Sequence, residues 1–252
     1  EETAQAPVRA LLPPSDLERS LARLVEAQRL YASMGLTTVQ DGGLAPDGVA
    51  LLEEAARRKL LQLDIVGYRL WLPAYAQAAD IATFGGYRDR LRIAGLKMIL
   101  DGSPQGKTAF LSEPYLVPPP GQKPDYRGYA SLPPQAIEKG VRAALTRGLP
   151  LLAHTNGDAA CQLLIDAVAK LRQETGSFEP KVVMIHAQTV RDDQLDRLAA
   201  LDIVPSFFIG HTFYWGDWHR EQTLGVARAE RISPARSALD RNMPFTLHTD
   251  TP

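Results

Sequence analysis

Short apolar runs alternate with amphipathic stretches along most of this 252-residue chain. The apolar runs predict seven strands, at 36–40, 64–72, 96–101, 150–155, 181–186, 203–208 and 244–249. Because the runs are nearly continuous in hydrophobicity, they are typical of parallel strands buried on both faces. The pattern therefore predicts repeated strand–helix units and an α/β fold class.

The stretches between these runs predict helices. The first helix begins at a capping box, Ser15-Asp16-Leu17-Glu18. Further helices are expected at 47–59, 75–93, 134–147, 158–173, 191–200 and 233–241. The segment 103–133 has no helical period and is rich in Pro and Gly, which is typical of a lid or a binding loop.

Seven strands are one fewer than a closed (β/α)8 barrel needs, and more than the five or six of most doubly wound sheets. The Gly42-Gly43 pair after the first run lacks the spacing of a dinucleotide-binding fingerprint. The doubly wound interpretation is therefore weak, and the strand pattern alone does no more than suggest a barrel.

Composition excludes several classes of function. The chain has 28 basic and 29 acidic residues without long runs of one sign, which argues against nucleic acid and anionic membranes as partners. The lone Cys161 excludes an internal disulfide and is expected to be a core residue. No run approaches the length of a membrane span, and the polar start EETAQAPVRA is unlike a signal peptide. Both ends of the sequence are expected to be cut points, so the localisation stays open, with the cytoplasm favoured.

Histidine and aspartate gather at the ends of the predicted strands. His154, His186, His211 and His248 lie at or just past four of these ends, and Asp41, Asp101 and Asp250 occupy comparable positions. A single strand-end histidine is more often structural than catalytic. Two on successive strands, with an aspartate two strands later, form a ligand set suited to Zn²⁺ or a similar ion, which activates water for hydrolysis.

Five stretches carry a resemblance to a known family: GLTTVQDGG (35–43), LKMILDGSPQGKTAFLSEPY (96–115), LLAHTNGDAA (151–160), VVMIHAQTV (182–190) and LHTDTP (247–252). In this order they resemble the amidohydrolase superfamily, in the family 3 branch that includes N-substituted formamide deformylase-like enzymes. The resemblance implies a TIM-type barrel and metal-dependent hydrolysis.

The resemblance also implies roles for individual residues. His154 and His186 match the metal-ligand histidines of strands five and six, and Asp250 matches the strand-eight aspartate that binds metal and shuttles the proton. Lys97 matches the strand-four lysine, which CO₂ can carboxylate to bridge two metals. Without the resemblance, a buried or ion-paired lysine would be the preferred interpretation of Lys97.

The family carries a His-x-His pair on strand one, whereas this sequence has no histidine before His154. We therefore expect residues 1–252 to be strands two to eight of the barrel, without strand one and without the strand-rich accessory domain. Such a chain is expected to bind metal weakly or not at all, to be inactive by itself, and to self-associate as a homo-oligomer through its unpaired strand edges.

The aromatic segment 211–219 is expected to be a loop over the site. Its Tyr214, Trp215 and Trp218 suit a small amide-type substrate, although a packed loop or a domain interface fits equally well. His211 is a candidate hydrogen-bond partner of the substrate carbonyl.

The sequence thus predicts a hydrolase of C–N bonds in amides, formamides or cyclic amides. Two alternatives stay open. One is a Schiff-base lyase that uses Lys97, which would leave His154, His186 and Asp250 unexplained. The other is a binding or structural module without catalysis.

Overall fold

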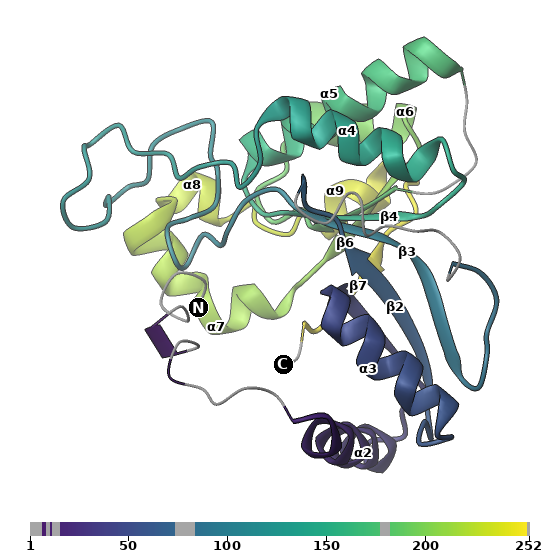
Figure 1. Cartoon of the computed structure of the whole chain (residues 1–252). Coiled ribbons are helices and arrows are strands. Elements are labelled where there is room, and N and C mark those ends of the chain that lie inside the picture. The colour runs from purple at the N-terminus through teal and green to yellow at the C-terminus, as the bar shows by residue number, and fades with distance from the viewer. Residues whose placement is uncertain (1–6, 9–10, 12–15, 74–83, 177–181, 251–252) are drawn as a thin grey trace. The chain divides into compact units, whose positions relative to one another are not determined.

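The computed structural model describes residues 7–8, 11, 16–73, 84–176 and 182–250. The chain divides into two compact units, residues 1–97 and 98–252, with the division falling inside one strand. Each unit is an arrangement of parallel strands covered by helices, as the alternating pattern predicts (Figure 1).

The first unit contains three parallel strands in chain order. They are β1 (Thr38–Leu44), β2 (Asp64–Leu70) and the larger part of β3 (Leu91–Ile99). Helices α2 (Leu17–Ser33) and α3 (Pro46–Arg57) pack with them, and the shared core includes Leu21, Leu52, Ile65 and Ile93. The side chain of Asp16 caps α2 by accepting the Arg19 N–H at 3.0 Å, so the cap is one residue later than expected.

The helix expected at 75–93 is wrong for its described part. Strand β3 already begins at Leu91, and Phe84 pairs with Ile93 in an isolated bridge. The physical reason is in the local residues. Gly85-Gly86 favours a turn over a helix, and Asp89 and Arg90 adopt left-handed backbone angles that end any helix before the strand. Residues 74–83 of the expected helix lie outside the described residues.

The second unit contains four more strands in chain order. They are β4 (Leu151–Thr155), β5 (Val182–His186), β6 (Ile203–Phe207) and the two-residue β7 (Thr246–Leu247), each parallel to the next. These strands begin within a few residues of the predicted positions, although β7 is much shorter than expected.

Helices of the second unit cover the outer face of these strands. Figure 1 shows α4 (Pro134–Leu145), α5 (Asp158–Thr175) and α6 (Asp192–Ala200) side by side, with α9 (Ala235–Asp240) next to α6. Cys161 lies on the buried side of α5, as expected of a core cysteine, and burial raises the pKa of its thiol.

The aromatic segment 211–219 is helical, which corrects the expected loop. It forms α7 (Gly210–Trp218), followed by a short π-helix (His219–Thr223) and by α8 (Val226–Ala229). The segment lacks the apolar spacing of an amphipathic helix, because aromatic side chains occur on all sides of it, and periodicity therefore could not reveal it. Within the described part of the chain, no helix is long and apolar enough to cross a membrane.

Candidate metal centre

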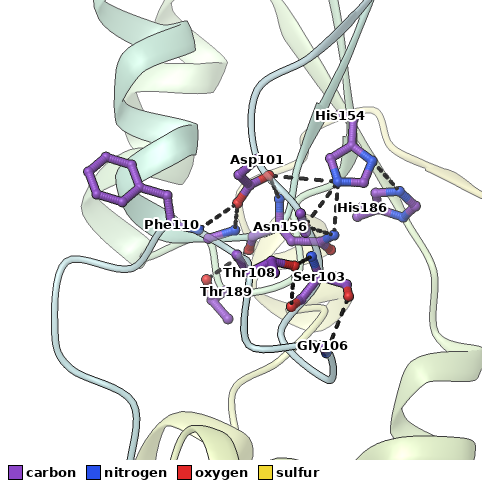
Figure 2. A network of polar contacts seen from close by, with 12 residues as sticks. Asp101, Ser103, Gly106, Thr108, Phe110, His154, Asn156, His186 and Thr189 are labelled. Atoms are coloured by element: carbon purple, nitrogen blue, oxygen red, sulfur yellow. Dashed lines mark hydrogen bonds and ion pairs between the residues drawn. The ribbon is translucent and has the colours of Figure 1, made fainter. Parts of the chain in front are cut away.

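Two predicted metal ligands lie together at the carboxyl ends of neighbouring strands. His154 is the fourth residue of β4 and His186 is the last residue of β5. The Nδ1 of His154 lies 3.1 Å from the Nε2 of His186, and the two rings meet edge to face with centroids 4.5 Å apart (Figure 2). Parallel strands thus bring two imidazoles from residues 32 positions apart to one place.

The backbone at the end of β5 helps to form this pair. In the parallel register His154 pairs with Ile185, so regular pleating would direct the next side chain, His186, to the opposite face. His186 instead has a φ of 71°, in the left-handed region that a side chain rarely adopts. This local strain breaks the alternation of side chains at the point where the two rings meet, as strain often does at functional sites.

A third histidine contacts the far nitrogen of His186, Nδ1, and the predicted aspartate lies nearer to Nε2, the nitrogen that faces His154. The Nε2 of His248 is 3.1 Å from the Nδ1 of His186, and the Nδ1 of His248 is 2.8 Å from the Ser206 hydroxyl. An Asp250 oxygen lies 3.8 Å from the Nε2 of His186, with 60% of the aspartate side chain exposed. His248 therefore contacts His186 with one ring nitrogen and Ser206 with the other.

The His154–His186 pair fits two ligands of one zinc ion. Zinc–nitrogen bonds of about 2.0–2.1 Å in a tetrahedron place two ligand nitrogens about 3.4 Å apart. The observed 3.1 Å between the facing nitrogens is close to this spacing. Among the residues that the structure describes, no group of three or more His, Cys, Asp or Glu side chains is arranged to hold a metal ion. The assignment of His154, His186 and Asp250 as metal ligands stays a prediction, and an Asp250 oxygen lies 3.8 Å from the Nε2 of His186.

Lys97 is half-buried in β3 and belongs to the first unit, whereas the histidines belong to the second. Its role as a carboxylated ligand stays a prediction.

His211 lies in the first turn of α7 and is buried, with its ring centroid 4.2 Å from that of Phe208 and 5.8 Å from that of His186. Burial, and then the nearby His219 and His248, lower the pKa of His211 to about 4. The ring is therefore neutral at pH 7, and its buried Nδ1 has no hydrogen-bond partner within the described part of the chain. A substrate carbonyl could accept from a neutral imidazole of this kind.

The three aromatic candidates for substrate binding are exposed to different degrees. Tyr214 is 73% exposed, whereas Trp215 and Trp218 are each 40% exposed. Trp218 also donates its indole N–H to the Gln105 carbonyl at 3.2 Å, with the Lys107 ammonium 5.4 Å from the ring centroid. Trp218 thus connects α7 to the loop after β3, and its contact with substrate stays a prediction, as do those of Tyr214 and Trp215.

Sequence reasoning missed a buried polar group below α7. The His219 ring is fully buried between the Gln188 amide and the Thr223 hydroxyl, each 3.0 Å away. Burial lowers the pKa of His219 to about 4. His219 stands beside tryptophans in the sequence. Its partner Thr223 is four residues away, but its other partner, Gln188, is 31 positions away, and no spacing in the sequence connects that pair.

Sequence reasoning also gave no role to Asp101, although Asp101 stood out as a strand-end carboxylate. Its side chain accepts backbone hydrogen bonds from Asn156 at 2.9 Å, Phe110 at 3.0 Å and Gly157 at 2.7 Å (Figure 2). One oxygen lies 3.7 Å from the Nε2 of His154. The position of Asp101 at a strand end marked it as a candidate in the sequence, but its hydrogen-bond partners are identified only by the fold.

Solved structures of metal-dependent hydrolases share this fold. A metal-dependent hydrolase from Pyrococcus furiosus matches 100% of this chain, with a TM-score of 0.79 and 25% sequence identity. A second metal-dependent hydrolase, from Pyrococcus horikoshii OT3, matches 94% of the chain with a TM-score of 0.77 and 25% identity. These likenesses confirm the predicted α/β fold class, a partial TIM-type barrel.

The sequence comparisons give the family. The model of the Amidohydrolase family matches residues 1–252, and the chain belongs to this family. YtcJ of Bacillus subtilis, an amidohydrolase by name, is 27% identical over 129 residues, which are 50% of this chain and 23% of YtcJ. Protein LONG AFTER FAR-RED 3 of Arabidopsis thaliana is 26% identical over 163 residues, 64% of this chain and 27% of that protein.

The matched regions are only parts of these relatives. This chain covers 51% of the Pyrococcus furiosus hydrolase and 46% of the Pyrococcus horikoshii one. The chain thus spans about half the length of the solved relatives and matches about a quarter of the curated ones.

Proposed function

We propose that this chain contributes two metal-binding histidines and the proton-transferring aspartate of a hydrolase that acts on C–N bonds of amides, formamides or cyclic amides. The observation that supports this most directly is the pair of facing nitrogens, Nδ1 of His154 and Nε2 of His186, 3.1 Å apart. Family membership and the likeness to two metal-dependent hydrolases agree with it.

His154 and His186 would hold one divalent cation, for which we propose zinc because imidazole ligands suit it. When bound, such an ion activates water and polarises a carbonyl group. His248 orients the His186 ring from behind through a contact of 3.1 Å, and the Ser206 hydroxyl holds His248 through a contact of 2.8 Å. Hydrogen bonds to the far side of a ligand histidine fix its ring and its tautomer.

Asp250 is the residue that we propose for proton transfer. Its carboxylate lies 3.8 Å from the Nε2 of His186 and is largely exposed, so water and substrate can reach it. As the water oxygen bonds to the carbonyl carbon, Asp250 accepts the proton that the water loses. It then returns this proton to the leaving nitrogen as the C–N bond breaks. His211, neutral at pH 7, can donate to the carbonyl oxygen as negative charge develops there.

Zinc binding to the 252-residue chain tests the metal part of the proposal. We expect weak, measurable binding in a competition assay with a chromogenic chelator, and at least tenfold weaker binding in both H154Q and H186Q. H219Q is the matched control, because it removes a buried histidine of the same unit that contacts neither ligand. Equal zinc affinity in the wild-type chain, H154Q and H186Q would refute the assignment.

Hydrolysis tests the C–N bond part and is measured in the full-length protein. N-formyl, N-acyl and cyclic amide substrates are compared with esters of the same acyl groups by following product release. We expect amide turnover that falls by at least a hundredfold in D250N. Turnover of the esters alone, or a D250N enzyme as fast as wild type, would contradict the proposal.

A further inference from the structure

Asp101 lies two residues after the end of β3, and three backbone N–H groups donate hydrogen bonds to its side chain. The residue is 1% exposed. One oxygen accepts from Asn156, and the other accepts from Phe110 and from Gly157 (Figure 2). A buried carboxylate is costly unless its oxygens are hydrogen-bonded, and three charge-assisted bonds offset that cost.

These donors belong to two segments that are distant in the sequence. Phe110 is in the long loop after β3, whereas Asn156 and Gly157 connect β4 to α5. The segments approach so closely that a Cβ on Gly157 would lie 1.9 Å from the Phe110 carbonyl oxygen. Asp101 therefore fixes the backbone immediately after His154 against the loop.

The same carboxylate contributes to the surroundings of the His154 ring. The Nε2 of His154 lies 3.1 Å from the Gly102 carbonyl oxygen and 3.7 Å from an Asp101 oxygen. The Asn156 side-chain nitrogen is 3.2 Å from the same Nε2, but it donates to the Gly102 carbonyl at 2.8 Å. With a carbonyl and a carboxylate as neighbours, a proton on Nε2 is favoured. The lone pair of the ring is then on Nδ1, the nitrogen that faces His186.

We propose that Asp101 is a positioning residue that holds His154 in its Nε2–H tautomer, with Nδ1 directed at the metal site. The carboxylate acts in two ways. It immobilises Asn156 and Gly157, the residues next to the ligand strand, and it places negative charge behind Nε2. Only the consequence for metal affinity rests on the proposed function. The tautomer itself is a property of the metal-free chain.

The first test therefore uses the metal-free wild-type chain and needs no variant. Long-range ¹H–¹⁵N correlation spectra distinguish the two nitrogens of each imidazole, and H154Q identifies the signals of His154. At pH 8 we expect His154 to be neutral with its proton on Nε2. A proton on Nδ1 would overturn the proposal.

The second test compares D101N with D158N. Asn at position 101 replaces one accepting oxygen with a donor, so a backbone N–H loses its partner and the charge near Nε2 is removed. Asp158 is a matched control, because it is also buried at this loop–helix junction. It bonds to Ser112 and Arg191, but no described contact links it to His154.

We expect D101N to lose the preference for Nε2–H and to bind zinc about 10- to 100-fold more weakly, the usual effect of removing a partner behind a ligand histidine. D158N should lose a similar amount of thermal stability and keep both the tautomer and the zinc affinity of wild type. A folded D101N with unchanged tautomer and unchanged zinc affinity would overturn the proposal.

If D101N does not fold, the wild-type spectrum still tests the proposal, because a proton on Nδ1 of His154 would overturn it. A wild-type Nε2–H tautomer without any zinc binding would refute the metal site and leave the positioning role supported.

Discussion

Acid destabilisation through His219 can be predicted quantitatively. The ring is fully buried, and burial lowers its pKa from the usual 6.5 to about 4. Between these two values the unfolded chain binds a proton that the folded chain does not bind. The free energy of unfolding is therefore highest above pH 6.5 and falls as the pH is lowered towards 4.

The magnitude follows from the size of the change in pKa. At about 1.4 kcal/mol for each pKa unit, neutral His219 contributes about 3 kcal/mol above pH 6.5 that is lost below pH 4. About 2 kcal/mol of this is lost between pH 7 and pH 4.5. That is a large fraction of the 5–15 kcal/mol that typically separates folded from unfolded states.

Urea unfolding of the wild-type chain and of H219Q, followed by far-UV circular dichroism at several pH values, isolates this contribution. Other groups also titrate in this range, but they are shared by both proteins and cancel in the difference. The stability advantage of wild type over H219Q should shrink by about 2 kcal/mol from pH 7 to pH 4.5.

The control is T223V, which removes the hydroxyl partner of His219 without removing the titrating ring. T223V should be less stable at every pH, by about 1 kcal/mol, and should keep the pH slope of wild type. A constant difference between wild type and H219Q across this pH range would refute the reasoning.

Two further predictions concern the backbone of the site. Since His186 has a φ of 71°, H186G should be about 1 kcal/mol more stable than H186A, whereas H154G should be less stable than H154A because His154 lies at a regular strand position. Urea unfolding of the four variants measures these differences, and an H186A variant at least as stable as H186G would contradict the left-handed conformation. G157A should lower the free energy of unfolding by about 1–3 kcal/mol, because its Cβ would meet the Phe110 carbonyl oxygen. The control G216A, whose Cβ would lie in open space on α7, should be neutral or stabilising. Equal melting temperatures of the two variants would show that the close approach at Gly157 is absent.

The fold was predictable wherever burial produced a continuous apolar run. The strands expected at 150–155, 181–186 and 203–208 match β4, β5 and β6 to within one residue, because parallel strands covered on both faces leave an unbroken hydrophobic signal. Prediction failed where that signal was absent. The start of β3 was assigned to a helix, and the aromatic α7 was assigned to a loop.

The candidate site was predictable to the level of residue type and strand end. His154 and His186 stood out because strand ends meet at one edge of a parallel arrangement, and the structure places them 3.1 Å apart. The polar groups behind them were not predictable in the same way. Ser206 lies within a strand, and its contact with His248 spans 42 positions along the chain, so its role depends on tertiary structure alone.

The pairing of His154 with His186 shows why local pattern is insufficient even for residues that the sequence identifies. Period-two reasoning applied to the observed register places His186 beside Thr155, with its side chain on the face opposite to that of His154. That reasoning alone would have separated the two proposed ligands.

The left-handed backbone at His186, continued at Ala187 with a φ of 46°, is what directs the imidazole back to His154. Such conformations cost about 1–2 kcal/mol for a residue with a side chain and persist only where surrounding contacts compensate for them. Here the two nitrogens of His186 contact His154 and His248 in the strained conformation. The strain and the site therefore depend on one another, and neither can be inferred from the sequence of β5 alone.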